Sequence, residues 1–443
     1  MRRALLVILI AAVAAAAAVL PRPDAAPEPL ADRIIDDPGL ATPVDAGIWY
    51  CPWAQANAAR DSLVAVATMA PATASLTFPV AIPGEPPDEA ELATLGPGAA
   101  HLTLSDLAQR GDSPSFIEFD AGPASAGVIV TGDVISADAC VATGPSEWLF
   151  VAGSTQTGEQ LSLRLFNPFP ETAKVTVSGF SEIGVEALGE LRGITVNPRS
   201  WRDVALEELL RQRQDLVISV RVDEGLVVPA MSFVSGDDEA WWAGTDIATE
   251  WEFPVARIDG LDAAAVVVAN PGLTPAEVVV DIYTPDGPTR AVTTVTAEPS
   301  APVRIDLAQF EGESIGIRVA ADVPVAAGVV AVGDGGTAVT AGIPGTARTW
   351  LVPGLRTLGR DRGTLWLLNT SGESVPVSIG VLTGAEVRNS QEVLDPGAQV
   401  AIRVRDDDAL GFVVDAGLPI TVAWSVDGPS GAAFGTAIAV SDE

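Results

Sequence analysis

Short apolar runs separated by turn residues recur along most of this chain. In residues 303–307 and 315–319, apolar side chains alternate with polar or small ones. An alternation of period two predicts a β-strand with one face against a core and the other in water. A turn sequence such as Thr-Pro-Asp-Gly, at residues 284–287, separates such runs. The pattern predicts an all-β protein of short antiparallel strands, with one helical segment at residues 206–214.

Three landmarks recur with a period of about 100 residues. A strand that starts with Trp-x-apolar-Pro, lacking only the Pro in the second copy, begins at Trp49, Trp148, Trp251 and Trp350. An Asn that ends an apolar run follows the last three Trp by 19 residues, at Asn167, Asn270 and Asn369. The first copy has Thr68 at this offset, and each copy has a later Pro before a strand. We interpret these Trp and Asn residues as structural residues of four homologous units.

The repeat sets the predicted domain organisation. The four units are expected at residues 47–145, 146–248, 249–347 and 348–443. Seven or eight short strands in each predict tandem immunoglobulin-like β-sandwiches. The alternative is an eight-bladed β-propeller with two blades in each copy. Sandwiches are favoured because the landmarks recur at about 100 residues and not at half that spacing.

The N-terminus carries an export signal. Two Arg follow Met1, and an unbroken apolar run occupies residues 4–20. This pattern predicts a signal peptide or membrane anchor at residues 1–20, which would hold the chain in the inner membrane if it is not cleaved. Residues 21–46 are rich in Pro, Ala and Asp, which predicts a linker. The folded part is therefore expected to be extracytoplasmic, either membrane-anchored or secreted.

Composition excludes one class of partner. The chain has 25 Lys plus Arg against 58 Asp plus Glu, a formal net charge of −33, with a single Lys at Lys174. Nucleic-acid binding requires clustered positive charge, so DNA and RNA are not expected partners. Hydrophobic residues make up 48% of the chain, enough for large cores, so the acidity does not indicate disorder.

Few residues of the chain are typical of catalysis. There is one His, His101, and no motif of a serine hydrolase, a zinc protease or a phosphate loop. The acidic clusters at residues 237–239 and 406–408 lack the spacing of a calcium loop, which favours solvated turns. We therefore predict no catalytic residue, no cofactor and no metal site. A glycan hydrolase that uses only carboxylates is the enzymatic alternative.

Two pairs of residues are candidates for a specific role in this chain, which otherwise has few residues typical of catalysis. Cys51 and Cys140 lie in the first and last strands of the first copy, and two Cys in an exported chain predict one disulfide. Trp241 and Trp242 follow the first acidic cluster and are the candidate contact for a glycan or a partner protein. The alternative for these Trp is packing, with one ring in the core and the other between domains.

The combined landmarks resemble a known family. A strand beginning Trp-x-apolar-Pro, a strand ending in Asn-Pro, a Val-rich strand before a turn, and Pro-Val-Ala-Ala-Gly-Val at residues 324–329 are its features. They resemble the repeats of an uncharacterised, domain-of-unknown-function family of exported actinobacterial proteins. The resemblance covers roughly residues 47–440 and implies an extracytoplasmic β-repeat protein of the cell envelope. Thr68 in copy one and Thr370 in copy four depart from the pattern.

These observations lead to an expected function. We predict a non-enzymatic protein, exported or tethered to the membrane, that acts as a scaffold or binding module in the cell envelope. Its expected partner is an envelope protein or a wall polymer. The alternatives are a carbohydrate-binding protein centred on Trp241 and Trp242, and the carboxylate-dependent glycan hydrolase.

Overall fold

The computed structural model describes residues 47–79, 88–94, 98–107, 109, 111–142, 144–284, 287–310, 314–355, 361–383, 386–404 and 408–440. The predicted signal or anchor at residues 1–20 and the predicted linker at residues 21–46 lie outside this part of the chain and stay predictions. Among the described residues, no helix combines the length and apolar character needed to cross a membrane.

The third copy shows how each repeat folds. One antiparallel sheet has the strand order β23-β22-β25-β20 and the other has the order β26-β25-β21-β24. The strands are β20 (Ala248–Arg257), β21 (Ala263–Ala269), β22 (Ala276–Thr284), β23 (Gly287–Ala297), β24 (Pro302–Asp306), β25 (Ile315–Gly333) and β26 (Gly336–Ala341). Strand β25 has 19 residues and runs through both sheets. The two sheets therefore form one unit, which we call a blade.

The fourth copy repeats this order. Its sheets are β30-β29-β32-β27-β34 and β33-β32-β28-β31, with the long strand β32 in both. The strands are β27 (Ala347–Pro353), β28 (Arg362–Leu368), β29 (Val375–Leu382), β30 (Val387–Leu394), β31 (Gln399–Arg403), β32 (Gly411–Gly428), β33 (Gly431–Thr436) and β34 (Ile438–Val440).

In the first two copies, separate strands take the place of the long one. The sheets of blade 1 are β1-β8-β4-β5 and β10-β9-β3-β6, and those of blade 2 are β11-β17-β13-β14, with β15 on β13, and β16-β12-β18-β19. Blade 1 contains β1 (Ile48–Cys51), β2 (Gln55–Ala56), β3 (Arg60–Thr68), β4 (Ala72–Phe78), β5 (Asp88–Thr94), β6 (Gly98–Thr103), the 3-10 helix η2 (Leu104–Leu107), β7 (Gly111–Asp112), β8 (Ser115–Phe119), β9 (Ala124–Gly132) and β10 (Ser136–Ala139). Blade 2 contains β11 (Glu147–Gly153), β12 (Glu159–Asn167), β13 (Ala173–Ser181), β14 (Gly184–Val185), η3 (Gly189–Leu191), β15 (Ile194–Val196), β16 (Ser200–Ala205), α2 (Leu206–Leu209), β17 (Leu216–Glu224), β18 (Val228–Ser235) and β19 (Asp238–Ala243).

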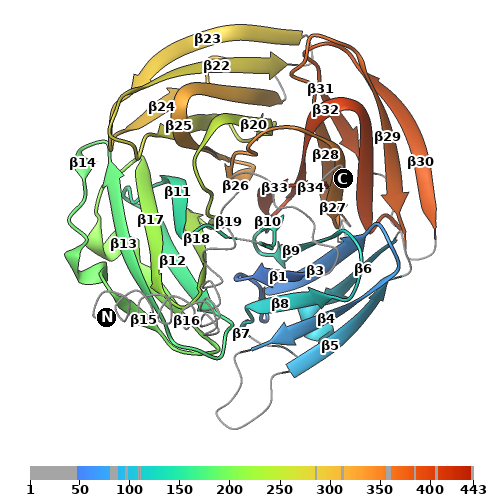
Figure 1. Ribbon diagram of the computed structural model, residues 1–443, viewed down its shortest axis with the longest axis horizontal. Helices are drawn as coiled ribbons and strands as arrows, with labels where there is room; N and C mark the ends of the chain where they lie inside the picture. The colour runs from blue at the N-terminus through green and yellow to red at the C-terminus, as the bar shows by residue number, and fades with distance from the viewer. Residues whose placement is uncertain are drawn as a thin grey trace, which may run out of the picture. The chain divides into compact units, whose positions relative to one another are not determined.

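The four blades close into a ring within the described part of residues 47–440 (Figure 1). One strand of each blade lies nearest the centre, and these four strands contact one another: β10 contacts β19 and β33, and β26 contacts the same two strands. The predicted all-β class and the paired antiparallel sheets are confirmed. The predicted propeller alternative has the wrong number of blades, because β25 and β32 continue from one sheet of a copy into the other.

Inner strands of the blades are buried on both faces. In β21, Val266 and Val268 pack in the core shared with the other sheet of blade 3. Their neighbours Ala265, Val267 and Ala269 belong to the core cluster that contains blade 2. This is why residues 263–269 are apolar throughout, whereas a strand with one wet face would alternate. The blade junctions thus form part of the hydrophobic core.

The repeated Trp residues take equivalent places in the blades. Trp49, Trp148, Trp251 and Trp350 are all buried in the first strand of their blade. Each lies opposite an apolar residue of the neighbouring strand, namely Ile117, Val220, Val319 and Val414. Apolar burial of so large a side chain stabilises each blade.

The repeated Asn residues hold a loop by three hydrogen bonds. The Nδ2 of Asn270 donates to the carbonyl oxygens of Thr274 and Ala297, each at 2.8 Å, and its Oδ1 accepts the N–H of Gly272 at 2.9 Å. Asn167 and Asn369 bond in the same way to the loops that follow them. In blade 1, the Thr68 hydroxyl donates to Ala70 O at 2.7 Å. The Asn side chain therefore provides hydrogen-bond partners for backbone N–H and C=O groups of a buried turn, which would otherwise lack them.

The predicted helix at residues 206–214 is wrong in its length. Only α2, Leu206–Leu209, is helical, and Leu210 is already extended. The N–H of Gln212 donates to Thr155 O at 2.9 Å, and Thr155 N–H donates to Arg213 O at 2.8 Å. These bonds to the loop between β11 and β12 replace the i→i−4 bonds that a longer helix would need.

Candidate functional site

The residue after each repeated Trp lies at a junction between blades. These residues are Tyr50, Leu149, Glu252 and Leu351. Three of them exchange backbone hydrogen bonds with the last segment of their own blade, at Val141, Thr245 and Ile343, and Leu351 pairs with Ile438 of β34. Two junctions therefore place a Leu at this position, and the other two place a Tyr and a Glu there. A cleft lies at each of the latter two.

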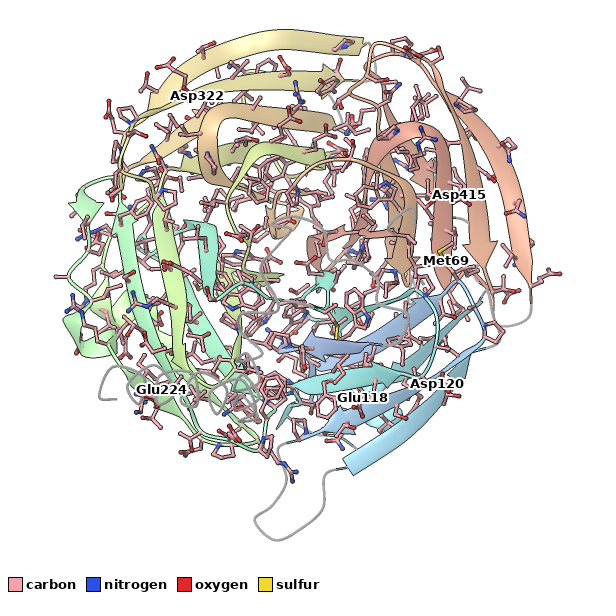
Figure 2. All side chains as sticks on the ribbon, viewed as in Figure 1. Met69, Glu118, Asp120, Glu224, Asp322 and Asp415 are labelled. Carbon is pink, nitrogen blue, oxygen red and sulfur yellow. A yellow bond between two sulfur atoms is a disulfide. The ribbon has the colours of Figure 1, made fainter. Side chains whose placement is uncertain are left out.

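The first cleft lies between blades 1 and 2, and we call it the aromatic cleft. Its volume is about 290 Å³. The Tyr50 ring lies 5.5 Å from that of Phe169 in the loop after Asn167, and 6.4 Å from that of Phe116, both in tilted arrangements. The remaining lining residues are Ile48, Thr77, Pro79, Glu118, Pro168, Pro170 and Arg199. Glu118 is exposed on β8 (Figure 2).

The electrostatics of the aromatic cleft keep Tyr50 neutral. Burial, with a smaller contribution from the Glu118 carboxylate, raises the pKa of Tyr50 to about 12. The hydroxyl therefore remains a hydrogen-bond donor at any physiological pH. The cleft therefore combines three aromatic rings, one of which carries a neutral hydroxyl, with the charged residues Glu118 and Arg199. That is the usual chemistry of a small-molecule site.

The second cleft lies between blades 3 and 4, and we call it the polar cleft. Its volume is about 620 Å³, and Glu250, Glu252, Arg318, Thr370, Ser371 and Glu373 are among its lining residues. The Arg318 guanidinium donates to Glu250 at 2.6 Å and lies 3.7 Å from the carboxylate of Asp281. Its charge is therefore already compensated within blade 3.

Glu252 joins the two blades at the base of the polar cleft. Its side chain is 1% exposed; Oε1 accepts the Thr370 hydroxyl at 2.8 Å, and Oε2 accepts the Thr421 hydroxyl. Burial raises the pKa of Glu252 to about 7, and the hydrogen bonds from the two threonines oppose that shift. Both oxygens are occupied and shielded from solvent, so the carboxyl group serves as a contact between blades 3 and 4.

The raised pKa of Glu252 makes stability depend on pH. An acid whose pKa is higher in the folded state holds its proton there after the unfolded chain has lost it, so stability falls as pH rises from about 4.5 to 7. Glu252→Gln keeps an acceptor and a donor for the threonines and cannot ionise. The variant is expected to gain on the order of 3 kcal/mol of unfolding free energy, relative to wild type, between pH 4.5 and pH 8.

Denaturant unfolding of both proteins at the two pH values measures this difference. Other titrating groups are common to both proteins and cancel in the comparison. Replacing Glu298, which is exposed, by Gln is the control for loss of a carboxylate at the surface. An equal pH dependence in wild type and Glu252→Gln would contradict the assignment.

Asp138 joins three blades at the centre of the ring. It lies on β10, is buried, and accepts the N–H of Ala139 at 2.8 Å and the N–H of Thr436 in blade 4 at 3.2 Å. It also accepts a backbone hydrogen bond from Ala243 in blade 2, and burial raises its pKa to about 6. This carboxyl group therefore helps to join the first blade to the last.

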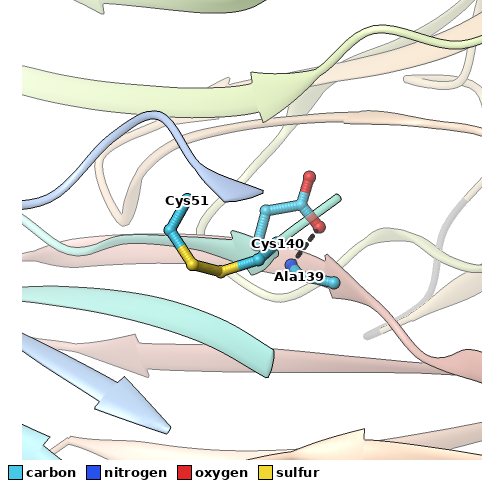
Figure 3. The surroundings of a disulfide bond; sticks show 4 residues. Cys51, Ala139 and Cys140 are labelled. Atoms are coloured by element: carbon cyan, nitrogen blue, oxygen red, sulfur yellow. Dashed lines mark hydrogen bonds between the residues drawn. A yellow bond between two sulfur atoms is a disulfide. The ribbon is translucent and has the colours of Figure 1, made fainter. Parts of the chain in front are cut away.

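The predicted disulfide is present. Cys51 at the end of β1 and Cys140 after β10 are bonded, with their Cα atoms 4.7 Å apart, as Figure 3 shows beside Ala139. The bond links the two sheets of blade 1, since β1 and β10 belong to different sheets. Such a bond is stable in an oxidising compartment.

Trp241 and Trp242 do not form an exposed platform. They are 7% and 1% exposed on β19, so neither presents an open ring to a sugar. Trp242 belongs to the core of blade 2, and Trp241 belongs to the cluster of blade 1. The guanidinium of Arg164 stacks over Trp241 at 4.9 Å. The glycan contact expected at this pair does not fit their burial, whereas packing in a core and at a junction does.

The remaining predicted residues lie in ordinary structural places. Glu239 of the first acidic cluster accepts hydrogen bonds from Arg60 and from Trp241 Nε1, and residues 406–407 of the second lie outside the described part of the chain. His101 lies in β6, opposite Ala65 of β3. Within the described residues, no three His, Cys, Asp or Glu side chains form a group that could hold a metal ion.

Sequence reasoning missed the residues of both clefts. Tyr50 and Phe169 are 119 positions apart, and Glu252 and Thr370 are 118 apart. A signal was nevertheless present, because the position after the repeated Trp is the one that changes between Leu, Tyr and Glu among copies. That variation beside the repeated Trp is the signal that the position meets a different neighbouring blade in each copy.

Comparisons with known proteins place the chain in a family. The sequence family described as "Family of unknown function (DUF5719)" matches residues 126–405, and no curated protein matches the chain. A crystal structure titled Thermotoga maritima 1070 is 19% identical over 22% of this chain and 94% of that chain, with a TM-score of 0.20. An α-L-rhamnosidase of Streptomyces avermitilis, complexed with L-rhamnose, is 8% identical over 91% of this chain and 57% of that chain, with a TM-score of 0.12. Neither structural score supports an argument, but the family match spans more than half of the sequence, so the chain belongs to the DUF5719 family of unknown function.

Proposed function

We propose that this protein is a non-enzymatic, extracytoplasmic binding protein of the cell envelope, and that it binds a wall polysaccharide in the aromatic cleft. The observation that carries the proposal is the group of three rings, Tyr50, Phe116 and Phe169, at the junction of blades 1 and 2. Aromatic rings stack on the apolar faces of sugar rings, and the polar groups around them fix orientation. The disulfide supports a location of the protein in an oxidising compartment.

The size of the aromatic cleft fits a short stretch of polymer. Its volume of about 290 Å³ is near the lower end of the range for small-molecule sites, about 300–1,000 Å³. The paired sheets of each blade support the immunoglobulin-like class, which we retain as a proposal for the blade topology.

Binding is expected to depend on the Tyr50 ring. Tyr50→Leu removes the ring and introduces the residue that blades 2 and 4 carry at the same position, so the fold should be retained. The variant should bind wall polysaccharide about three- to tenfold more weakly than wild type. Tyr50→Phe keeps the ring and should retain most of the affinity.

The measurement is a titration of the complete exported chain with purified wall polysaccharides, followed by calorimetry. Melting temperatures of both variants control for misfolding. The proposal fails if wild type binds no wall polysaccharide, or if Tyr50→Leu binds as tightly as wild type.

The polar cleft offers a second candidate, carboxylate-dependent glycan hydrolysis. The observation in its favour is the pKa of about 7 at Glu252, a value suited to a general acid. Against it, both Glu252 oxygens accept threonine hydroxyls and the side chain is 1% exposed. Release of reducing ends by wild type, and its loss in a folded Glu252→Gln protein, would favour hydrolysis.

A further inference from the structure

A turn beside the aromatic cleft holds an Arg in a backbone conformation that favours Gly. The residue after the repeated Pro is Arg199 in blade 2, Ser300 in blade 3 and Gly397 in blade 4. All three have positive φ angles, 48°, 54° and 68°, and each donates its N–H to a carbonyl of the Asn loop in its own blade. Gly adopts this conformation without steric cost, and a residue with a long side chain does not.

The side chain of Arg199 lines the aromatic cleft. The residue is exposed, and its N–H donates to Phe169 O at 3.0 Å, which fixes it beside one of the stacking rings. It takes part in none of the ion pairs found within the described part of the chain. In a chain with a net charge of −33, its positive charge stands out in a cleft whose other charged residue is Glu118. Strained residues concentrate at functional sites.

We propose that Arg199 sets the ligand class of the aromatic cleft, which takes sugar rings that carry a carboxylate. This inference rests on the proposed function of the cleft. The Arg199 guanidinium offers two parallel N–H donors to the carboxylate of the ligand, while the sugar ring of the ligand stacks on Tyr50 and Phe169. The Glu118 carboxylate in the same cleft repels such a ligand, so the acidic group must lie on the Arg199 side.

The test compares two probes with the same sugar backbone, one with a free carboxylate and one in which a methyl ester removes its charge. A short oligogalacturonate and its methyl ester are titrated into the complete exported chain. The acid is expected to bind about tenfold more tightly than the ester, the usual effect of one charge-assisted hydrogen-bonded pair. Glu118→Gln should tighten binding of the acid more than binding of the ester.

The matched variant is Arg199→Gly, the residue that blade 4 carries at this turn. It should abolish the preference for the acid over the ester, reduce the affinity for the acid far more than that for the ester, and not lower the melting temperature. Arg199→Lys, which keeps the charge but not the paired donors, should fall between wild type and Arg199→Gly.

Two outcomes separate the inference from the proposed function. Equal affinities for acid and ester, both weakened by Tyr50→Leu, would overturn the role of Arg199 and leave the sugar site in place. Failure of wild type to bind either probe or any wall polysaccharide would overturn both. Full affinity for the acid in Arg199→Gly would also contradict the inference.

Discussion

Trp251→Ala is expected to lower the free energy of unfolding by about 3–5 kcal/mol, the range for a large aromatic side chain removed from a core. Trp251 is 1% exposed, and its Nε1 donates to Val325 O at 2.8 Å. Truncation leaves a cavity and an unsatisfied buried carbonyl. Because β20 pairs with β25, the strand that runs through both sheets of blade 3, the surrounding residues cannot close the gap without disturbing both sheets.

Denaturant titration followed by circular dichroism measures this loss. Trp251→Phe is the matched control, because it keeps a six-membered aromatic ring in the core while losing the hydrogen bond and part of the side-chain volume, so its cost should be smaller. Leu273→Ala, at a position that is 95% exposed in the same blade, should change little. A midpoint for Trp251→Ala equal to that of Leu273→Ala would contradict the packing role.

Removing the disulfide is expected to have an effect of similar size. Cys51 and Cys140 are 89 residues apart, and opening a loop of that length costs about 4–5 kcal/mol in the chain-entropy treatment. The double variant Cys51→Ala, Cys140→Ala should therefore unfold at a clearly lower denaturant concentration. The loss should be concentrated in blade 1, because both sulfur atoms belong to it.

Thiol titration of unfolded wild-type protein, purified from an oxidising compartment, checks the covalent state. No free thiol should be found, since the only two Cys of the chain are bonded to each other. Wild type treated with a reducing agent should approach the stability of the double variant. Two titratable thiols in the untreated protein, or equal midpoints with and without reductant, would show that packing alone holds blade 1.

The strands, turns and Asn loops within each blade could be predicted from the sequence, because they depend on patterns that extend over a few residues. The fixed distance from Trp251 to Asn270 spans the connection between β20 and β21, and the Asn hydrogen bonds are made within one copy. A period of two along a strand, and a Pro or Gly at a turn, act over a few residues. Those signals can be read without knowing which blade lies beside which.

Closure of the ring could not be predicted in this way. An apolar run such as residues 263–269 shows that both faces are buried but not what covers the second one. Both clefts arise from that second face, where Tyr50 meets Phe169 and Glu252 meets Thr370. The pair Trp241 and Trp242 was ambiguous for the same reason, since alternate residues of β19 point into two different cores.

The position of the disulfide determines how blade 1 would respond to mechanical load. Strand β1 has four residues and is held to β8 by an antiparallel ladder, which a pull on the chain before Ile48 would peel open one bond at a time. Peeling must stop at Cys51, because from there the tension passes through the sulfur atoms to Cys140, beside the innermost strand β10. Two residues earlier, Asp138 joins that strand to blade 4. Force applied at the N-terminal side would therefore be carried covalently to the closing contact of the ring and shared by the first and last blades.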